Sequence, residues 1–222
     1  YMQEGRFEKA RELLLSKRFN IYEGGEGKLT RMHGWLYTMW GRQDQLNGNL
    51  DEAMRWFETA LVYPQNYGEG RHYSAQEANI YYYTGLLLDA QEKMEEAREA
   101  WEKAANQPNQ VTEVSYFAAL SLQKLGEADK AEAIFRSMVE TGAEQKKNAH
   151  LYGYFGVGMP SPLPFELDVK PLHLAEANLL LALGHKGLGE EKESRAALQA
   201  LKEIDPWNLK LCFLEKLGVL EA

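Results

Sequence analysis

The sequence predicts an all-α fold, a right-handed α-solenoid in which antiparallel helical hairpins stack in register and are joined by long loops. Three observations predict it. A short motif recurs along the chain, one interval between copies is 34 residues, and a proline follows three of the copies. Because one hairpin of this kind cannot bury its apolar face alone, recurring copies indicate units that stack on their neighbours.

The motif has a glycine, a small residue five positions later and a bulky apolar residue four positions after that. Gly48, Ala53 and Phe57 form one copy, and another copy carries Glu92 where the glycine is expected. The small residues of the five copies lie at intervals of 43, 44, 34 and 63 residues, and they are Ala10, Ala53, Ala97, Ala131 and Ser194.

The helix after Gly48 shows why this motif marks a hairpin. Over residues 50–63, Ala53, Phe57 and Ala60 share one apolar stripe. A small residue lets two antiparallel helices approach closely, and the aromatic ring fills the adjoining groove. Glycine suits the tight turn because it reaches a positive φ without strain. Proline cannot continue the hydrogen-bond ladder of a helix, so it ends the second helix of three units, at Pro64, Pro108 and Pro206.

These signals place residues 1–222 in one domain. A half-unit over 1–18 retains only the tail of its first helix, so the chain looks like part of a longer array. A terminal helix, 207–220, is predicted to cover the last unit, with Cys212 and Phe213 on its apolar stripe. Complete units are predicted at about 32–64, 76–108, 111–141 and 173–206, with an insertion over 142–172.

The insertion over 142–172 is too rich in glycine and proline for regular helix. Its aromatic and large apolar side chains argue against solvated disorder. It therefore either folds across the groove of the array or forms part of a partner surface, and self-packing keeps exposed apolar patches small.

The motif resembles that of the tetratricopeptide repeat, in which W-x2-L-G-x2-Y is followed by A-x3-F and then proline. The resemblance covers most of the chain and implies a helix–turn–helix unit. One copy carries Tyr81, Thr84, Gly85, Leu88, Ala97, Trp101, Ala104 and Pro108.

More loosely, the chain is similar to the C-terminal repeat region of large bacterial proteins of unknown function. In those proteins a β-rich domain related to sugar mutarotases precedes the repeats. Residues 22–28, residues 63–70 and the proline-rich stretch before Leu172 carry this resemblance. It implies that the chain is the helical half of a two-part protein linked to carbohydrate metabolism.

The composition limits the classes of partner and chemistry. A net charge of −8, from 33 acidic and 25 basic residues, opposes attraction to nucleic acid or anionic lipid. No apolar run reaches the roughly 18–20 residues of a membrane helix. The single cysteine, Cys212, excludes an internal disulfide and fits a cytoplasmic location. The five histidines lack metal-ligand spacing. We therefore expect no cofactor, no metal and no catalysis.

The first helices of the units predict a concave, aromatic-rich trough suited to an extended or helical peptide. The alternative is that these aromatic side chains pack in the core or lie under the insertion. The candidate groove residues are Trp35, Met39, Arg42, Asn79, Tyr82, Tyr83, Tyr116, Phe117 and Gln123.

Two related loops form a second candidate site. A Gly-Glu-Gly-basic segment precedes the first helix of two consecutive units, so both loops should project from the same edge. Backbone amides near helix N-termini can hold an anionic or polyhydroxylated group. The alternative is a self-packed turn whose glycines permit unusual φ and ψ. The loop residues are Gly25, Glu26, Gly27, Lys28, Gly68, Glu69, Gly70 and Arg71.

The sequence thus predicts a non-catalytic scaffold that binds a peptide or a partner domain through its concave face. The alternative is an accessory repeat domain of a carbohydrate-related protein, with the Gly-Glu-Gly loops packing on an N-terminal β domain of the same polypeptide. The expected partner is a protein or peptide, with no nucleic acid and no membrane, and the oligomeric state stays open.

Overall fold

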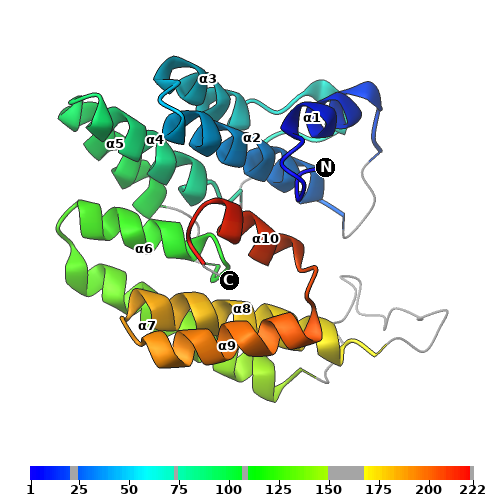
Figure 1. Ribbon diagram of the computed structural model, residues 1–222, viewed down its shortest axis with the longest axis vertical. Coiled ribbons are helices and arrows are strands. Elements are labelled where there is room, and N and C mark those ends of the chain that lie inside the picture. The colour runs from blue at the N-terminus through cyan, green and yellow to red at the C-terminus, as the bar shows by residue number, and fades with distance from the viewer. Residues whose placement is uncertain (21–24, 73–74, 107–109, 150–167, 221–222) are drawn as a thin grey trace.

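The structure is a computed structural model that describes residues 1–20, 25–72, 75–106, 110–149 and 168–220. These residues form α-helices and one short 3-10 helix, Gln65–Tyr67, with no strand among them (Figure 1), so the predicted all-α class is confirmed. The α-helices are α1 (Phe7–Ser16), α2 (Lys28–Leu46), α3 (Leu50–Ala60), α4 (Ala78–Ala90), α5 (Met94–Ala105), α6 (Ser115–Lys124), α7 (Ala128–Lys147), α8 (Lys170–Gly187), α9 (Glu191–Ile204) and α10 (Leu209–Lys216).

Consecutive helices pack as hairpins, namely α2 with α3, α4 with α5, α6 with α7 and α8 with α9. These hairpins fall where the complete units are predicted. The first helices of the hairpins also pack side by side, α2 on α4, α4 on α6 and α6 on α8. Each hairpin therefore buries its apolar face against the next one, as the recurring motif requires.

Both ends of the predicted insertion, 142–172, are helical. Helix α7 continues to Lys147 and α8 begins at Lys170, so the prediction of irregular structure there is wrong, while residues 150–167 lie outside the described part of the chain. The glycine that suggested a break serves close packing instead. A Cβ on Gly142 would lie 2.9 Å from the carbonyl oxygen of Ala177, so only glycine lets α7 and α8 approach this closely.

One turn geometry joins the two helices of every hairpin. Gly48, Gly126 and Gly189 have φ of 82°, 81° and 76°. The residue after the turn donates its amide to a carbonyl five positions earlier, as Asn49 does to Asp44 at 2.9 Å. This is the hydrogen-bonding pattern of a helix that ends in a left-handed residue. The copy without glycine keeps the geometry, because Glu92 has φ of 61°.

Glycines in the first helices of two hairpins make room for large aromatic rings. A Cβ on Gly41 would lie 2.5 Å from the ring of Phe57, and one on Gly85 would lie 2.3 Å from the ring of Trp101. Each pair joins the first helix of a hairpin to the aromatic position of the second. The aromatic position of the motif therefore marks a ring that packs against a glycine of the preceding helix.

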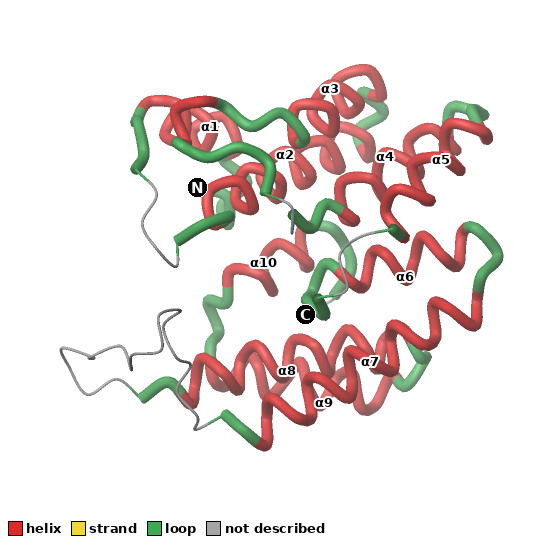
Figure 2. Tube along the Cα trace, turned by 180° about the vertical axis from the view of Figure 1, so that it is seen from behind, coloured by secondary structure: helices red, strands yellow, loops and turns green. Residues whose placement is uncertain are grey.

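Helix α10 lies within the segment 207–220 that was predicted as a terminal helix, but its contacts extend beyond the last hairpin. It lies between α2 and the α8–α9 hairpin, as both views show (Figures 1 and 2), and it packs on α2. The ring centroids of Trp35 and Phe213 are 5.6 Å apart, and the Tyr83 hydroxyl donates to the Leu217 carbonyl at 3.3 Å. Helix α10 therefore fills the space between the first and last hairpins.

Candidate functional site

The predicted aromatic trough is not an open surface. Six of its nine residues are buried, and Phe117 has no exposed surface at all. Helix α10 covers this face through Phe213 and Leu217, and the rings pack on one another, with 5.7 Å between the centroids of Tyr83 and Phe117. The prediction of an open trough is therefore wrong for the buried six, although Trp35 and Asn79 line a small hollow of about 110 Å³. The six are Trp35, Met39, Asn79, Tyr83, Tyr116 and Phe117.

The other three trough residues keep some exposure. Gln123 is exposed, and Arg42 and Tyr82 are half-buried. The Arg42 guanidinium lies 5.4 Å from the centre of the Tyr83 ring and donates to the Gln45 side chain at 2.9 Å. Burial raises the pKa of Tyr83 above its usual range, which fits a phenol enclosed by apolar neighbours. This face consequently belongs to the core rather than to a peptide groove.

The two Gly-Glu-Gly loops lie together, and one caps the helix that follows the other. The Glu69 carboxylate accepts hydrogen bonds from the amides of Gly27 at 2.8 Å and Thr30 at 3.4 Å, at the first turn of α2. Gly27 has φ of 75°, which favours glycine. The anion position at this helix N-terminus is thus taken by the protein's own carboxylate, which contradicts anion binding there.

The second loop is held by a further carboxylate, Glu77, which precedes α4 and is 2% exposed. It accepts a hydrogen bond from the Tyr63 hydroxyl at 2.6 Å and pairs with the Arg71 guanidinium at 2.6 Å. Burial, followed by the hydrogen bond to Glu77, raises the pKa of Tyr63 above its usual range. The hydrogen bond and the charge of Glu77 likewise raise the pKa of Arg71. These contacts fix the shape of the loop.

The outer surface of the loops is open to solvent. Glu26, Lys28, Gly68, Gly70 and Arg71 are exposed, whereas Gly25 is half-buried and accepts the Lys28 amide at 3.3 Å. A Cβ on Gly70 would meet nothing within 4 Å. The loops therefore present a shaped, charged surface at the edge where α2 and α4 begin.

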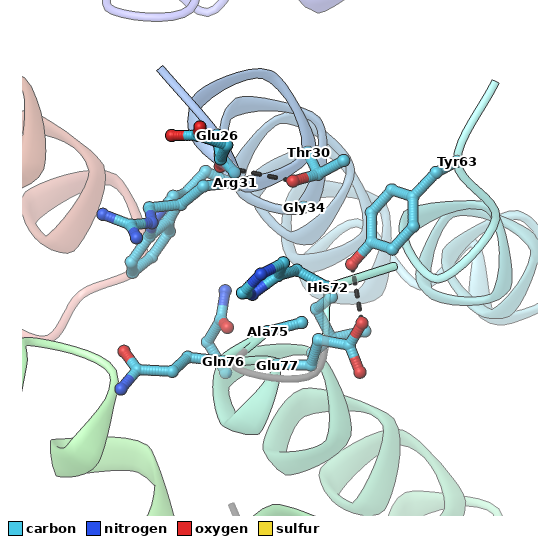
Figure 3. Close-up of a pocket in the computed structure, with 13 residues that line it drawn as sticks. Glu26, Thr30, Arg31, Gly34, Tyr63, His72, Ala75, Gln76 and Glu77 are labelled. Carbon is cyan, nitrogen blue, oxygen red and sulfur yellow. Dashed lines mark hydrogen bonds between the residues drawn. The ribbon is translucent and has the colours of Figure 1, made fainter. Parts of the chain in front are cut away.

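Three hollows adjoin one another along this edge, and we call them together the edge row. The first, of about 110 Å³, lies between α2 and the segment that leads to α4. Figure 3 shows Thr30, Arg31 and Gly34 on one side of it and Ala75, Gln76 and Glu77 on the other. The side-chain amide of Gln76 donates a hydrogen bond to the backbone carbonyl of Gln110 at 2.8 Å, which connects the first hollow to the segment before the next hairpin.

The middle hollow, of about 310 Å³, lies between the hairpins α4–α5 and α6–α7, and it shares Gln76 with the first. The third hollow, of about 710 Å³, shares Gln110 and Val111 with the middle one and Arg31 with the first. We call it the Lys210 hollow. The edge row thus runs past the N-termini of the first helices of successive hairpins.

A charged cluster forms one wall of the Lys210 hollow. The Lys210 ammonium lies 2.6 Å from a Glu176 carboxylate oxygen and 3.2 Å from one of Glu113, whose side chain is 3% exposed. Burial opposes the charge of Lys210, but the two carboxylates outweigh it and raise its pKa above the usual range. The cluster joins α10 to α8 and to the segment before α6, so it fixes the C-terminal helix in place.

Carboxylates dominate the edge row. Each helix that begins there has an acidic residue beside its first turn, so the positive ends of the helix dipoles are already neutralised. These residues are Glu69 for α2, Glu77 for α4, Glu113 for α6 and Asp168 for α8. The linings include the cations Arg31 and Lys210 and the carboxylates Glu26, Glu77, Glu113, Glu144 and Glu176.

Metal and thiol chemistry have no visible site among the described residues. Within residues 1–20, 25–72, 75–106, 110–149 and 168–220, no cluster of histidine, cysteine or acidic side chains could hold a metal ion. Cys212 is half-buried, and burial raises the pKa of its thiol. In the same part of the chain, no helix is both long and apolar enough to cross a membrane.

No protein-family model matches the chain, and no solved structure shows a significant match to it. The edge row must therefore be interpreted from its own residues. Sequence reasoning placed Glu113 on the concave face but missed Lys210 and Glu176, with which it forms ion-pair contacts across three separate elements. One signal in the sequence could have pointed to this edge. Glu77 and Glu113 each lie at or just before the start of the first helix of a unit.

Proposed function

We propose that this chain is a non-catalytic interaction domain of tetratricopeptide-like hairpins stacked as a right-handed solenoid. Its ligand is a segment of a protein partner, bound in extended form along the edge row. The single observation that carries the proposal is the row of three adjacent hollows, which share lining residues past successive hairpins, because an extended peptide needs a long surface with repeated pockets.

The charge of the edge row selects the kind of segment. Five carboxylates against two permanent cations favour a basic peptide over an acidic one. The chain as a whole carries a net charge of −8, so its field also attracts a cationic segment.

The single cysteine supports a cytoplasmic location, where thiols stay reduced.

The concave face supports the proposal poorly, although the sequence favoured it. Phe213 and Leu214 of α10 are 2% and 0% exposed, so α10 is an integral part of the core. A peptide could reach Tyr83, which bonds to the Leu217 carbonyl at the end of α10, only after this helix was displaced, at the cost of about 1.5–3 kcal/mol for each large apolar side chain exposed. The edge row needs no such rearrangement.

An NMR titration of the isotope-labelled chain tests the proposal. Three ten-residue peptides that differ only in basic, acidic or neutral side chains are added in turn. We expect the basic peptide to shift the amide signals of Gln76, Gln110 and Gln145 and the acidic one to leave them unchanged. Shifts confined to the outer helices α3, α5 and α9, or no shift with any peptide, would rule the edge row out.

Charge-reversed variants sharpen the same test. Glu144→Lys lies in the edge row, whereas Glu99→Lys is exposed on α5 and lies outside it. Both change the net charge of the chain equally, so a general field effect weakens binding equally in both. The proposal requires a much larger loss for Glu144→Lys.

One observation favours a second function, that of an accessory domain beside an N-terminal β domain of the same polypeptide. The Gly-Glu-Gly loops have a fixed shape, held by Glu69 and Glu77, and their outer surface is exposed. Chemical cross-linking of the full-length polypeptide tests it. Links from Lys28 to the β domain would support the accessory role, whereas reactivity of Lys28 unchanged by that domain would argue against it.

A further inference from the structure

We infer that the Lys210 hollow is a specificity pocket for one basic side chain, arginine or lysine, of the bound peptide. The inference rests on the proposed function, because it names what the largest of the three hollows recognises. Its volume of about 710 Å³ falls within the range of about 300–1,000 Å³ that ligand pockets occupy. A side chain of the peptide therefore fits inside it.

The walls of the hollow come from five parts of the chain. They are the first turn of α2, the segment 110–113, the C-terminal half of α7, the N-terminal half of α8, and α10. Helix α7 packs on α8 and α10 packs on α2, and an ion pair of Lys210 joins α10 to α8. A pocket built from packed helices keeps its shape before the ligand arrives, which lowers the cost of binding.

The charges inside the hollow favour a cation. Lys210 is committed to Glu113 and Glu176, so it is not available to pair with an anion. The Glu144 side chain is exposed and has no ion-pair partner among the described residues. Glu176 uses one carboxylate oxygen for Lys210, and its side chain is still 46% exposed. Two carboxylates can therefore accept hydrogen bonds from an entering ammonium or guanidinium.

The position of Arg31 orients the ligand. Arg31 lies where the Lys210 hollow meets the first hollow, so it repels a cation at that end. Glu144 on α7 and Glu176 on α8 supply the attractive carboxylates of the same hollow. A basic side chain should therefore point its charged group between α7 and α8, with the peptide backbone nearer the first hollow.

The remaining lining suits the rest of a long basic side chain. Val111 and Leu180 supply apolar surface for the methylene stem. Gln145 and Asn148 carry amide oxygens that accept hydrogen bonds. The His173 Nδ1 atom lies 2.8 Å from the Ala149 carbonyl, which only accepts, so Nδ1 donates and the neutral ring keeps Nε2 as an acceptor. These groups add acceptors to the carboxylates of Glu144 and Glu176.

A matched set of probes tests the pocket. The ten-residue probe peptide contains a single arginine, and its control carries citrulline, which has nearly the same shape without the charge. We expect the arginine peptide to shift the signals of Glu144, His173 and Glu176 and to bind about tenfold more tightly than the citrulline peptide. Spermidine is the third probe, because a free amine offers the same chemistry as a basic side chain.

Two matched glutamate substitutions test whether the preference for arginine over citrulline arises in the Lys210 hollow. Glu144→Gln removes a carboxylate that lines the hollow and has no ion-pair partner in the described part of the chain, and Glu140→Gln removes an exposed one on the same helix outside the hollow. We expect only Glu144→Gln to reduce the preference for arginine over citrulline. Equal reduction by both variants would overturn the inference.

The outcomes separate this inference from the proposed function. If both peptides shift the edge row and bind equally, the pocket for a basic side chain is refuted while peptide binding stands. If neither peptide shifts the NMR signal of any residue of the edge row, both the pocket and the proposed peptide binding are refuted. If spermidine binds more tightly than the arginine peptide, a peptide side chain is not the ligand, and the inference is overturned.

Discussion

The carboxylate of Glu69 accepts a hydrogen bond from the amide of Gly27 at 2.8 Å, although 42 residues separate them. The loop that follows the α2–α3 hairpin thereby caps α2, the first helix of that same hairpin. The contact replaces a local capping side chain, which α2 lacks. Two neighbouring loops that are similar in sequence thus have different roles, because one supplies the carboxylate and the other the helix N-terminus.

We expect Glu69→Ala to lower the free energy of unfolding by about 1–2 kcal/mol, because two amides of α2 lose their acceptor. Urea denaturation measures the change. Glu26→Ala is the matched control, since Glu26 is the corresponding, exposed glutamate of the first loop. Equal effects of the two substitutions would show that the cap contributes nothing.

The turn at Glu92 offers a stabilising substitution. A side chain at φ of 61° is strained by about 1–2 kcal/mol, and glycine removes the strain at some cost in chain entropy. We expect Glu92→Gly to raise the free energy of unfolding by about 1 kcal/mol. Thermal and urea unfolding measure it.

The reverse change is the control for Glu92→Gly. Gly48 occupies the same turn with φ of 82°, and a Cβ there would meet nothing within 4 Å. We expect Gly48→Ala to destabilise the chain by about 1 kcal/mol through backbone strain alone. A neutral Gly48→Ala would mean that these turns do not require the left-handed conformation.

The local features of the fold could be predicted from the sequence because they depend on short spacings. The glycine, small and aromatic positions of one motif lie within ten residues, so Gly48, Ala53 and Phe57 already specify a turn and a close helix contact. The position of α10 could not be predicted this way. Its contact with α2 joins Phe213 to Trp35, and no local pattern encodes that pairing.

The candidate site was harder to predict for the same reason. An aromatic residue on the first helix of a unit faces either a groove or a neighbouring helix, and only the placement of α10 decides between them. Tyr83 shows this, because its hydroxyl bonds to Leu217. The Lys210 hollow depends on Glu113, Glu176 and Lys210, which converge only in the folded chain.

His33 makes the stability of the fold depend on pH. Its Nε2 lies 2.8 Å from the Thr59 carbonyl, which can only accept, so Nε2 donates and Nδ1 accepts from the Tyr67 hydroxyl at 3.0 Å. The neutral ring therefore has both nitrogens hydrogen-bonded. Burial lowers the pKa of His33 below its usual range.

The sign of the pH effect follows from this lowered pKa. Between the folded pKa and the unfolded value of about 6.5, the unfolded state binds more protons, so stability rises with pH. The contribution is complete above about pH 6.5 and is lost as the pH falls from there through the folded pKa. We expect urea denaturation to show this slope in the parent chain and in His72→Gln, and a flatter one in His33→Gln. An unchanged slope in His33→Gln would contradict it.

The ion pairs of Lys210 should stabilise the packing of α10 against the rest of the fold. We expect Lys210→Met to lower the free energy of unfolding by about 3 kcal/mol, because it leaves the Glu113 carboxylate buried without its partner. This is the lower part of the usual range for such pairs, since the Lys210 side chain is 26% exposed. Hydrogen exchange should show the faster opening of α10 directly.

A double substitution separates the ion pair from the packing of the lysine stem. If Glu113 destabilises the Lys210→Met variant because it is unpaired, Glu113→Gln should recover part of the loss, and the two substitutions together should cost less than their sum. Lys130→Met is the control, because Lys130 pairs with Glu127 at the surface and its loss should cost at most about 1 kcal/mol. Additive effects of Lys210→Met and Glu113→Gln would show that the Lys210–Glu113 pair contributes nothing to holding α10.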